Sequence, residues 1–155
     1  MKITLTGYGE VDNLLLESLQ AGQKPLVLDL FCQRQQTVDE LDARYVQGDL
    51  PFLFDHHETT FNRYGNRPWA VVDISRCAAA VYHAWLLEQP LTAAVRQRVE
   101  RMSSIVNMAN DRDLWLGQEP DSRLWQAMVT LCGPWGVLMR LAADPDAALT
   151  ESERE

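Results

Sequence analysis

The chain has 155 residues, of which 46% are hydrophobic and 23% charged. This length favours a single domain, and the composition excludes intrinsic disorder for most of the chain. The 22 acidic and 14 basic residues give a formal net charge of -8, which would repel the phosphate backbone of a nucleic acid. The charge therefore excludes an extensive nucleic-acid surface. A small phosphorylated substrate or a short oligonucleotide is still compatible with it, because bound cations can reverse the local sign.

Cysteine usage and hydrophobic patterning indicate a cellular location. Cys32, Cys77 and Cys132 are widely spaced and form no C-x-x-C pair, which predicts reduced thiols. No segment approaches the roughly 20 apolar residues of a membrane span, and the first residues contain no long apolar run. We therefore expect a cytoplasmic protein without a membrane segment.

Short apolar runs alternate with helical periodicity in the first half of the chain. In chain order, the pattern predicts a strand at 3–5, a helix at 11–19, a strand at 26–31, a helix at 37–45, a strand at 52–54, a loop at 58–67 and a strand at 69–74. The apolar run 26–31 is almost unbroken, as expected for a strand covered on both faces. Thr37, with Glu40 three residues later, predicts a capping box for the second helix.

Helical patterns dominate the second half. They predict helices at 77–87, 92–105 and 121–131, followed by a last short helix after Gly133 and Pro134. The acidic segment 144–155 is predicted to be a disordered tail. We expect an α/β fold in which a mostly parallel sheet is flanked by helices, with a helical second half and one partial domain over 1–143.

Polar residues follow two of the predicted strands. Asp29 interrupts the run 26–31, and Asp55, His56 and His57 come directly after 52–54. Because parallel strands bring their carboxyl ends to one edge of a sheet, these side chains should meet there. The alternative is that Asp55 caps a turn and that both histidines are surface residues. Placement at a strand end favours a site, and carboxylate with imidazole suits Mn²⁺ or another divalent cation.

Four segments of the chain resemble the DHH-family phosphoesterases, which are named for the Asp-His-His triplet. In this sequence they are Leu26-Val27-Leu28-Asp29, Phe52-Leu53-Phe54-Asp55-His56-His57-Glu58-Thr59, Asp73-Ile74-Ser75-Arg76-Cys77-Ala78-Ala79 and Asn110-Asp111-Arg112-Asp113-Leu114-Trp115. They occur in the family's order over roughly residues 8 to 140. The resemblance implies two-metal hydrolysis of phosphoester or phosphoanhydride bonds, commonly with manganese.

The resemblance also implies roles for individual residues. Asp29 would bridge the two metals, and His56 would bind one of them. Asp55 would orient its neighbours in the catalytic triplet, and His57 would contact the substrate phosphate. An acid of the last segment, Asp111 or Asp113, would complete the metal site, and the sequence does not decide between them. Arg76 would also bind phosphate, unless it is an ordinary solvated arginine.

Two parts of the family pattern are not found in this sequence. The family's first motif, a histidine with Asp-x-Asp-Gly, has its nearest counterpart in Glu10-Val11-Asp12-Asn13, which lacks the histidine and the glycine. The C-terminal substrate-binding domain is also not found. Three readings follow: a phosphoesterase-like enzyme that keeps one metal site, an inactive binding module that pairs with another copy or with a separate N-terminal part, or a fragment of a longer product.

Overall fold

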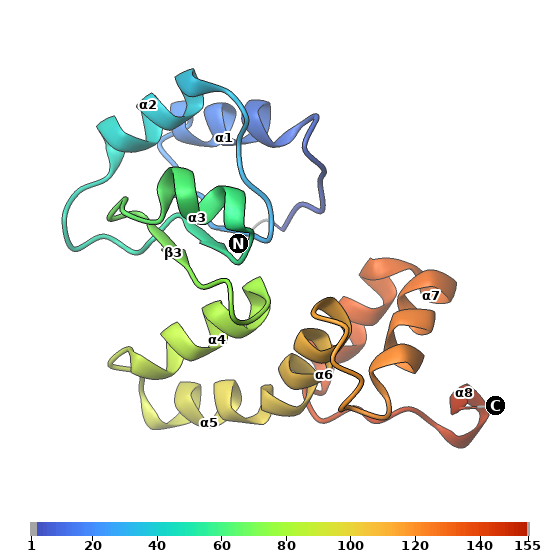
Figure 1. Ribbon diagram of the computed structural model, residues 1–155. Helices are drawn as coiled ribbons and strands as arrows, with labels where there is room; N and C mark the ends of the chain where they lie inside the picture. The colour runs from blue at the N-terminus through green and yellow to red at the C-terminus, as the bar shows by residue number, and fades with distance from the viewer. Residues whose placement is uncertain (1–2, 155) are drawn as a thin grey trace. The chain divides into compact units, whose positions relative to one another are not determined.

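The computed structural model describes residues 3–154 and divides the chain into two compact units, Met1–Tyr82 and His83–Glu155 (Figure 1). The sequence pattern predicts one domain over 1–143, whereas the division falls within α4 (Ala78–Glu88). All the strands described belong to the first unit, and the second unit is helical. The protein therefore has an α/β fold with a helical majority.

The sheet of the first unit has three short parallel strands in the order β1 (Val27–Leu28), β2 (Leu53–Asp55) and β3 (Ala70–Val72). Successive side chains of a strand point to opposite faces. Leu53 on one face of β2 belongs to the hydrophobic core, and the Phe54 ring on the other face contacts the Tyr82 ring at 4.8 Å between centroids. The central strand is thus covered on both faces. The same expectation for the run 26–31 is wrong, because β1 lies at the edge of the described sheet and leaves Leu26 and Leu28 exposed.

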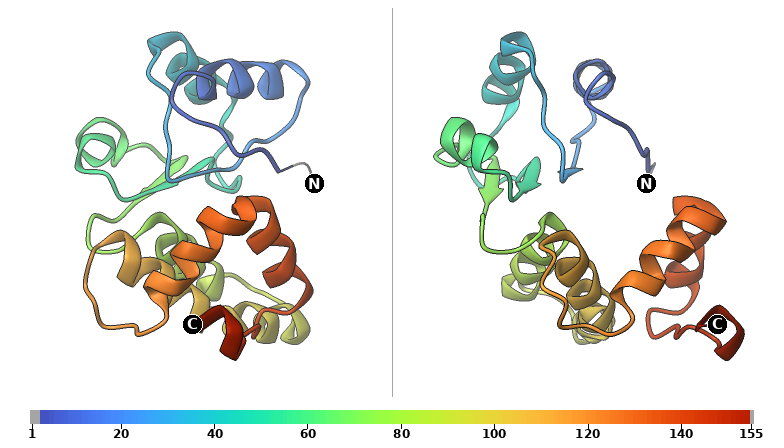
Figure 2. Two further views of the ribbon diagram at one scale, coloured as in Figure 1. Left: turned by 90° about the vertical axis from the view of Figure 1, so that its right-hand side faces the viewer. Right: turned by 45° about the vertical axis from the view of Figure 1, so that its right-hand side comes forward.

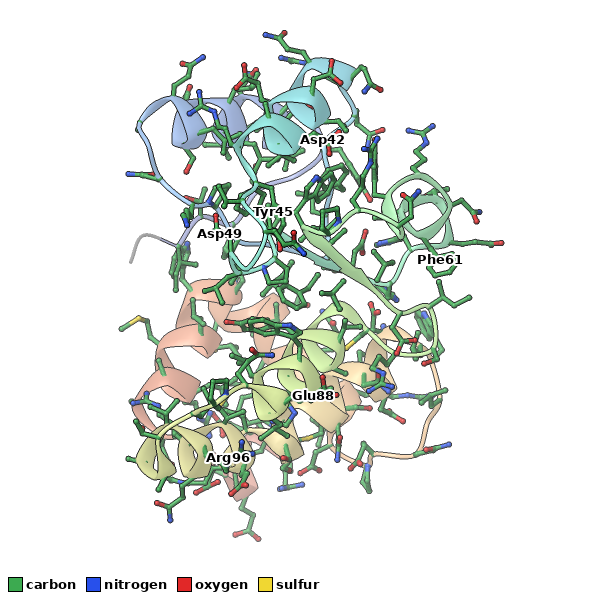
Figure 3. The ribbon with its side chains drawn as sticks, turned by 90° about the vertical axis from the view of Figure 1, so that its left-hand side faces the viewer. Asp42, Tyr45, Asp49, Phe61, Glu88 and Arg96 are labelled. Atoms are coloured by element: carbon green, nitrogen blue, oxygen red, sulfur yellow. The ribbon has the colours of Figure 1, made fainter. Side chains whose placement is uncertain are left out.

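Three helices accompany the sheet: α1 (Val11–Gln20), α2 (Gln35–Arg44) and α3 (Glu58–Tyr64). The first two lie side by side, and α3 lies beside β3 (Figures 1 and 2). Their core is made of apolar side chains that are at most 4% exposed: Val11, Leu15, Leu19, Phe31, Cys32, Val38, Leu41, Phe52, Leu53 and Trp69. Asp42 on α2 (Figure 3) accepts a hydrogen bond from the indole N–H of Trp69 at 2.7 Å, so the one polar atom of this ring is satisfied.

A buried aspartate of α1 caps α2. The Asp12 carboxylate is 3% exposed and accepts hydrogen bonds from the backbone N–H groups of Gln33 and Arg34 and from the Thr37 hydroxyl, at 3.0, 3.1 and 2.6 Å. The predicted capping role of Thr37 is therefore wrong, since α2 begins at Gln35 and Thr37 lies inside it. The N–H groups bonded to Asp12 belong to the two residues that precede α2. Burial raises the Asp12 pKa, but these hydrogen bonds and the Arg34 charge outweigh burial and lower it.

Two further expectations for the first unit are wrong. Residues 3–5 form no strand, because a strand is stable only when its backbone pairs with a neighbour and this segment has none in the described sheet. The predicted loop 58–67 is largely helix α3. The negative charge of Glu58 in its first turn interacts favourably with the positive end of the helix dipole. Gly65 and Pro68, which suggest a loop, lie beyond the end of the helix at Tyr64.

The second unit contains α5 (Ala93–Arg101), α6 (Ser103–Asp113), α7 (Ser122–Ala143) and α8 (Glu151–Arg154). The predicted helix 92–105 is divided into α5 and α6 near Met102. Gly133, with φ of 74° and ψ of 157°, breaks α7 into two halves, as the Gly-Pro pair predicts. Among residues 3–154, no helix combines the length and hydrophobicity needed to cross a bilayer.

The acidic segment 144–155 differs from the disordered tail that its composition predicts. It contains α8, and Leu149 is 5% exposed. Arg140 of α7 forms an ion pair with Glu153 at 2.7 Å, and Arg101 forms one with Asp146 at 2.5 Å. Arginines that are distant in sequence bind the acidic residues of this segment, and acidic composition alone does not reveal such partners.

Candidate metal centre

Two acids lie at the carboxyl edge of the parallel sheet. Asp55 is the last residue of β2. Asp29 follows β1, and its backbone N–H donates to the carbonyl of Phe54 at 3.1 Å, which holds it beside β2. Asp29 has a left-handed backbone with φ of 64°, a conformation that aspartate adopts more readily than most residues. The turn that ends β1 is therefore built at a residue that also carries a metal-binding group.

Four of the predicted site residues lie together at this edge. One potential ligand atom from each of Asp29, Asp55, His56 and His57 lies within 4.8 Å of the other three. His56 Nε2 is 3.1 Å from Asp29 Oδ1, and His57 Nδ1 is 2.8 Å from Asp55 Oδ1. The two imidazole rings are 4.6 Å apart between centroids. We refer to these four residues as the Asp/His cluster, and its ligand set could hold a metal ion.

Asp55 is the buried member of the Asp/His cluster, with 1% of its surface exposed. Its Oδ1 accepts hydrogen bonds from the backbone N–H groups of His56 and His57, at 2.7 and 3.4 Å, and contacts the His57 ring. Its Oδ2 has no hydrogen-bond partner anywhere in the described chain, residues 3–154. A buried oxygen without a partner costs about 1–3 kcal/mol. A cation bound beside Asp55 would remove this penalty.

The contacts between acids and imidazoles determine which ring nitrogens carry protons. An ionised carboxylate oxygen only accepts hydrogen bonds, so a ring nitrogen bonded to it must be the donor. With Asp55 ionised, the contact at 2.8 Å would place the His57 ring proton on Nδ1. With Asp29 ionised, the contact at 3.1 Å would place the His56 ring proton on Nε2. A cation could replace the proton shared by His56 and Asp29.

The Asp/His cluster is partly open to solvent. The side chains of Asp29 and His57 are 56% and 42% exposed, whereas those of His56 and Asp55 are 14% and 1% exposed. Burial on one side fixes the geometry of the triplet, and exposure on the other side gives a small ligand access. This combination suits a binding site better than a purely structural ion pair.

Arg76, which the sequence suggests as a phosphate ligand, follows β3. It forms an ion pair with Asp73 at 2.7 Å, and the backbone N–H of Asp73 donates to the carbonyl of Asp55 at 3.1 Å. Hydrogen bonds from the side chain and backbone of Ser75, together with the Arg76 charge, lower the Asp73 pKa although burial opposes them. The positive charge of Arg76 is therefore matched by an ionised acid.

The acids of the last motif, Asp111 and Asp113, belong to the second unit. Asp111 is 3% exposed and accepts hydrogen bonds from the Ser122 hydroxyl, at 2.6 Å, and from the backbone N–H of Gln118. The Ser122 hydrogen bond is the main cause of its lowered pKa, which burial opposes. Asp111 thus closes the connection between α6 and α7. Asp113, the last residue of α6, is exposed.

Asp12 has a role that the sequence did not indicate. Asp12 belongs to the segment Glu10-Val11-Asp12-Asn13, the nearest counterpart of the first motif in this sequence. Its carboxylate caps α2 and is not in the Asp/His cluster. A signal for this buried role was present in the sequence, because Asp12 shares the apolar face of α1 with Leu15 and Leu19, where an acid is not expected without partners.

Comparisons with protein-family models, curated proteins and solved structures find no match to this chain.

Proposed function

We propose that this chain is a DHH-type phosphoesterase-like protein that uses a divalent cation to hydrolyse a phosphodiester or phosphoanhydride bond of a nucleotide or short oligonucleotide. The observation that carries the proposal is the Asp/His cluster at the carboxyl edge of the sheet, with ligand atoms within 4.8 Å of one another. Ligands of parallel sheets bind at this edge. The unpartnered Oδ2 of Asp55 is independent support for a cation.

The chemistry of the ligands suits Mn²⁺ or another divalent cation. Two carboxylates and two imidazoles form a mixed oxygen and nitrogen set without thiolate, which suits manganese better than a soft metal. A divalent cation bound here would polarise a phosphoryl oxygen and activate water for attack on phosphorus. We propose that Asp29, Asp55 and His56 hold this cation.

The remaining chemistry falls to His57. Asp55 fixes the orientation of the His57 ring through Nδ1, at 2.8 Å, and the ring is 42% exposed. With Nδ1 occupied, a second proton on Nε2 would allow His57 to donate a hydrogen bond to a substrate phosphate. Asp55 would therefore act as the positioning residue of the triplet, and His57 as the residue that contacts the substrate.

Metal binding is the first test. Isothermal titration of the intact chain with Mn²⁺ should show binding that Asp29→Ala and His56→Ala each weaken at least about tenfold. His83→Gln is the matched control, because His83 is the third histidine of the chain and contacts the carbonyl of Val99. If the parent binds no Mn²⁺, or if the cluster variants bind as tightly as His83→Gln, the proposed site is wrong.

Hydrolysis of bis(4-nitrophenyl) phosphate is the second test. We expect slow turnover that requires Mn²⁺ and that His57→Ala abolishes. The same variant should still bind Mn²⁺ through the remaining carboxylates and His56, so that loss of turnover with retained metal assigns His57 to the chemical step. A parent that binds Mn²⁺ but hydrolyses no phosphodiester would show that the site is not an esterase.

A non-catalytic assembly module is the alternative function. One observation favours it: β1 lies at the edge of the sheet, and Leu26 and Leu28 are 47% and 42% exposed there. Apolar side chains on an edge strand are typical of surfaces that pair with another chain. Light scattering should then show a homo-oligomer that Leu28→Lys dissociates, whereas a monomeric parent would argue against this alternative.

A further inference from the structure

A cavity of about 410 Å³ lies within the second unit, between α6 and the two halves of α7. Its size is in the range of small-molecule sites. The lining is mainly apolar and includes the polar side chains of Arg112, Asp113, Ser122 and Gln126. The apolar lining residues are Ile105, Met108, Ala109, Trp115, Trp125, Val129, Val137 and Leu141. We refer to it as the α6–α7 cavity. The composition of its lining is typical of a site for an amphiphilic small molecule.

The sequence builds the α6–α7 cavity through helical spacing and one break. Ile105, Met108 and Arg112 share a face of α6, because residues three and four apart lie on the same side of a helix. The left-handed Gly133 breaks α7, so Val137 from the second half lines the same cavity as Trp125 from the first half. A continuous α7 would not fold back around this space.

Trp115 lines the α6–α7 cavity and has an unusual backbone conformation. Its backbone is left-handed, with φ of 56°, and the N–H of Leu116 donates to the carbonyl of Asp111 at 3.0 Å, as in a helix C-cap of the Schellman type. Glycine is the usual residue at this position, because a side chain is strained there. The indole is nevertheless 76% exposed and contributes no core packing. Strain of this kind is found most often at functional positions.

The lining of the α6–α7 cavity carries one positive side chain, Arg112, next to the acidic Asp113. Its guanidinium lies over the Trp115 ring, 3.9 Å from the centroid. Among the ion pairs of residues 3–154, none involves Arg112. A cation held on an aromatic face, beside an apolar cavity, is complementary to a ligand that is anionic at one end and planar and apolar at the other.

We propose that the α6–α7 cavity binds a planar aromatic ring bearing an anionic group, in the form of a nucleoside monophosphate whose base packs against Trp115 and the apolar walls and whose phosphate pairs with Arg112. The choice of a nucleotide over another aromatic anion rests on the proposed function. The amide of Gln126 lines the cavity and can hydrogen-bond to the edge of a base. Binding here involves residues of the second unit only and does not require the metal.

The test uses the intact chain in EDTA, with AMP as the probe in equilibrium dialysis. Trp115→Gly should weaken AMP binding about tenfold, the effect of losing one stacked base, while the melting temperature stays the same or rises because the strain is removed. Ala109→Phe, which fills the cavity, should also weaken binding. Trp135→Ala is the control, since Trp135 is 47% exposed but does not line the cavity.

Three further ligands separate the parts of the proposal. Arg112→Gln should weaken AMP binding about tenfold and leave adenosine binding unchanged, because only AMP carries the charge that Arg112 pairs with. Ribose 5-phosphate should bind weakly, since it lacks the ring. Indole-3-acetate distinguishes the sources of the aromatic anion: if it binds more tightly than AMP, the assignment to a nucleotide is wrong.

The inference fails if AMP does not bind in EDTA, or if Trp115→Gly and Trp135→Ala bind it equally well. His56→Ala separates this failure from that of the proposed function. This variant should bind AMP like the parent while losing Mn²⁺. If His56→Ala instead loses AMP binding, the nucleotide binds at the Asp/His cluster and not in the α6–α7 cavity.

Discussion

Replacing Asp55 by asparagine separates metal binding from folding. The amide of Asp55→Asn keeps an oxygen that can accept the hydrogen bonds from His56 and His57. It removes the charge and replaces Oδ2, the oxygen that has no partner among the described residues, with an NH₂ group. We therefore expect the free energy of unfolding of the metal-free variant to lie within about 1 kcal/mol of the parent's, because one unpartnered buried group replaces another.

The metal response should differ much more. A cation present at 100 times its dissociation constant stabilises the folded state by about 2.7 kcal/mol. For a unit of the size of Met1–Tyr82, this corresponds to a rise in melting temperature of roughly 10 °C or more. Asp55→Asn removes a buried anionic ligand that no other residue replaces. The variant should therefore lose most of this rise.

Thermal unfolding followed by circular dichroism, with excess Mn²⁺ and with EDTA, measures both quantities in the intact chain. His83→Gln, with its substitution in the second unit, should retain the full metal-dependent rise. Our reasoning is refuted if Asp55→Asn keeps the rise, or if the parent shows none. A large loss of stability of Asp55→Asn in EDTA would refute the view that Oδ2 has no structural role.

The remaining predictions concern structural acids and the last motif. Asp12→Ala should destabilise the first unit by about 3 kcal/mol, because it removes a helix cap and leaves the buried Thr37 hydroxyl without its acceptor; the exposed Asp39→Ala, measured by the same urea titration, should change stability by less than about 0.5 kcal/mol. The Asp12 pKa is lowered from 3.8, so the contribution of its carboxylate to the free energy of unfolding should be complete above pH 3.8 and decline as the pH falls through the lowered pKa. If the stability of Asp12→Ala falls equally with acid, this prediction is contradicted. In calorimetry, Asp111→Asn should lower the melting temperature of the second unit, because it weakens the acceptor of the Ser122 hydroxyl and the Gln118 N–H. The exposed Asp113→Asn is its control, and an equal loss in both variants would contradict the structural role of Asp111.

Much of the candidate metal centre could be predicted without coordinates. Hydrophobic runs of buried strands are local features of sequence, and parallel strands place the residues that follow them at one edge. Asp29, Asp55, His56 and His57 could therefore be grouped correctly, although they belong to two separate segments. Helix boundaries were less certain, because loop signals such as Gly65 and Pro68 fix where a helix must have ended and not where it begins.

The roles of the other acids depended on tertiary structure. Asp12, Asp111 and Asp113 are the same residue type, so the sequence alone does not distinguish their roles. Asp12 caps a helix that begins 23 residues later in the chain, and Asp111 holds a loop through Ser122. A carboxylate is a general acceptor, so its function is decided by which donors the fold brings to it. Sequence predicted three of the four expected strands correctly, with their order along the chain and the chemistry available at their ends, but not the absence of a strand at 3–5. Only the packing of distant segments decided which acids are hydrogen-bonded and which oxygen, Asp55 Oδ2, has no hydrogen-bond partner among residues 3–154.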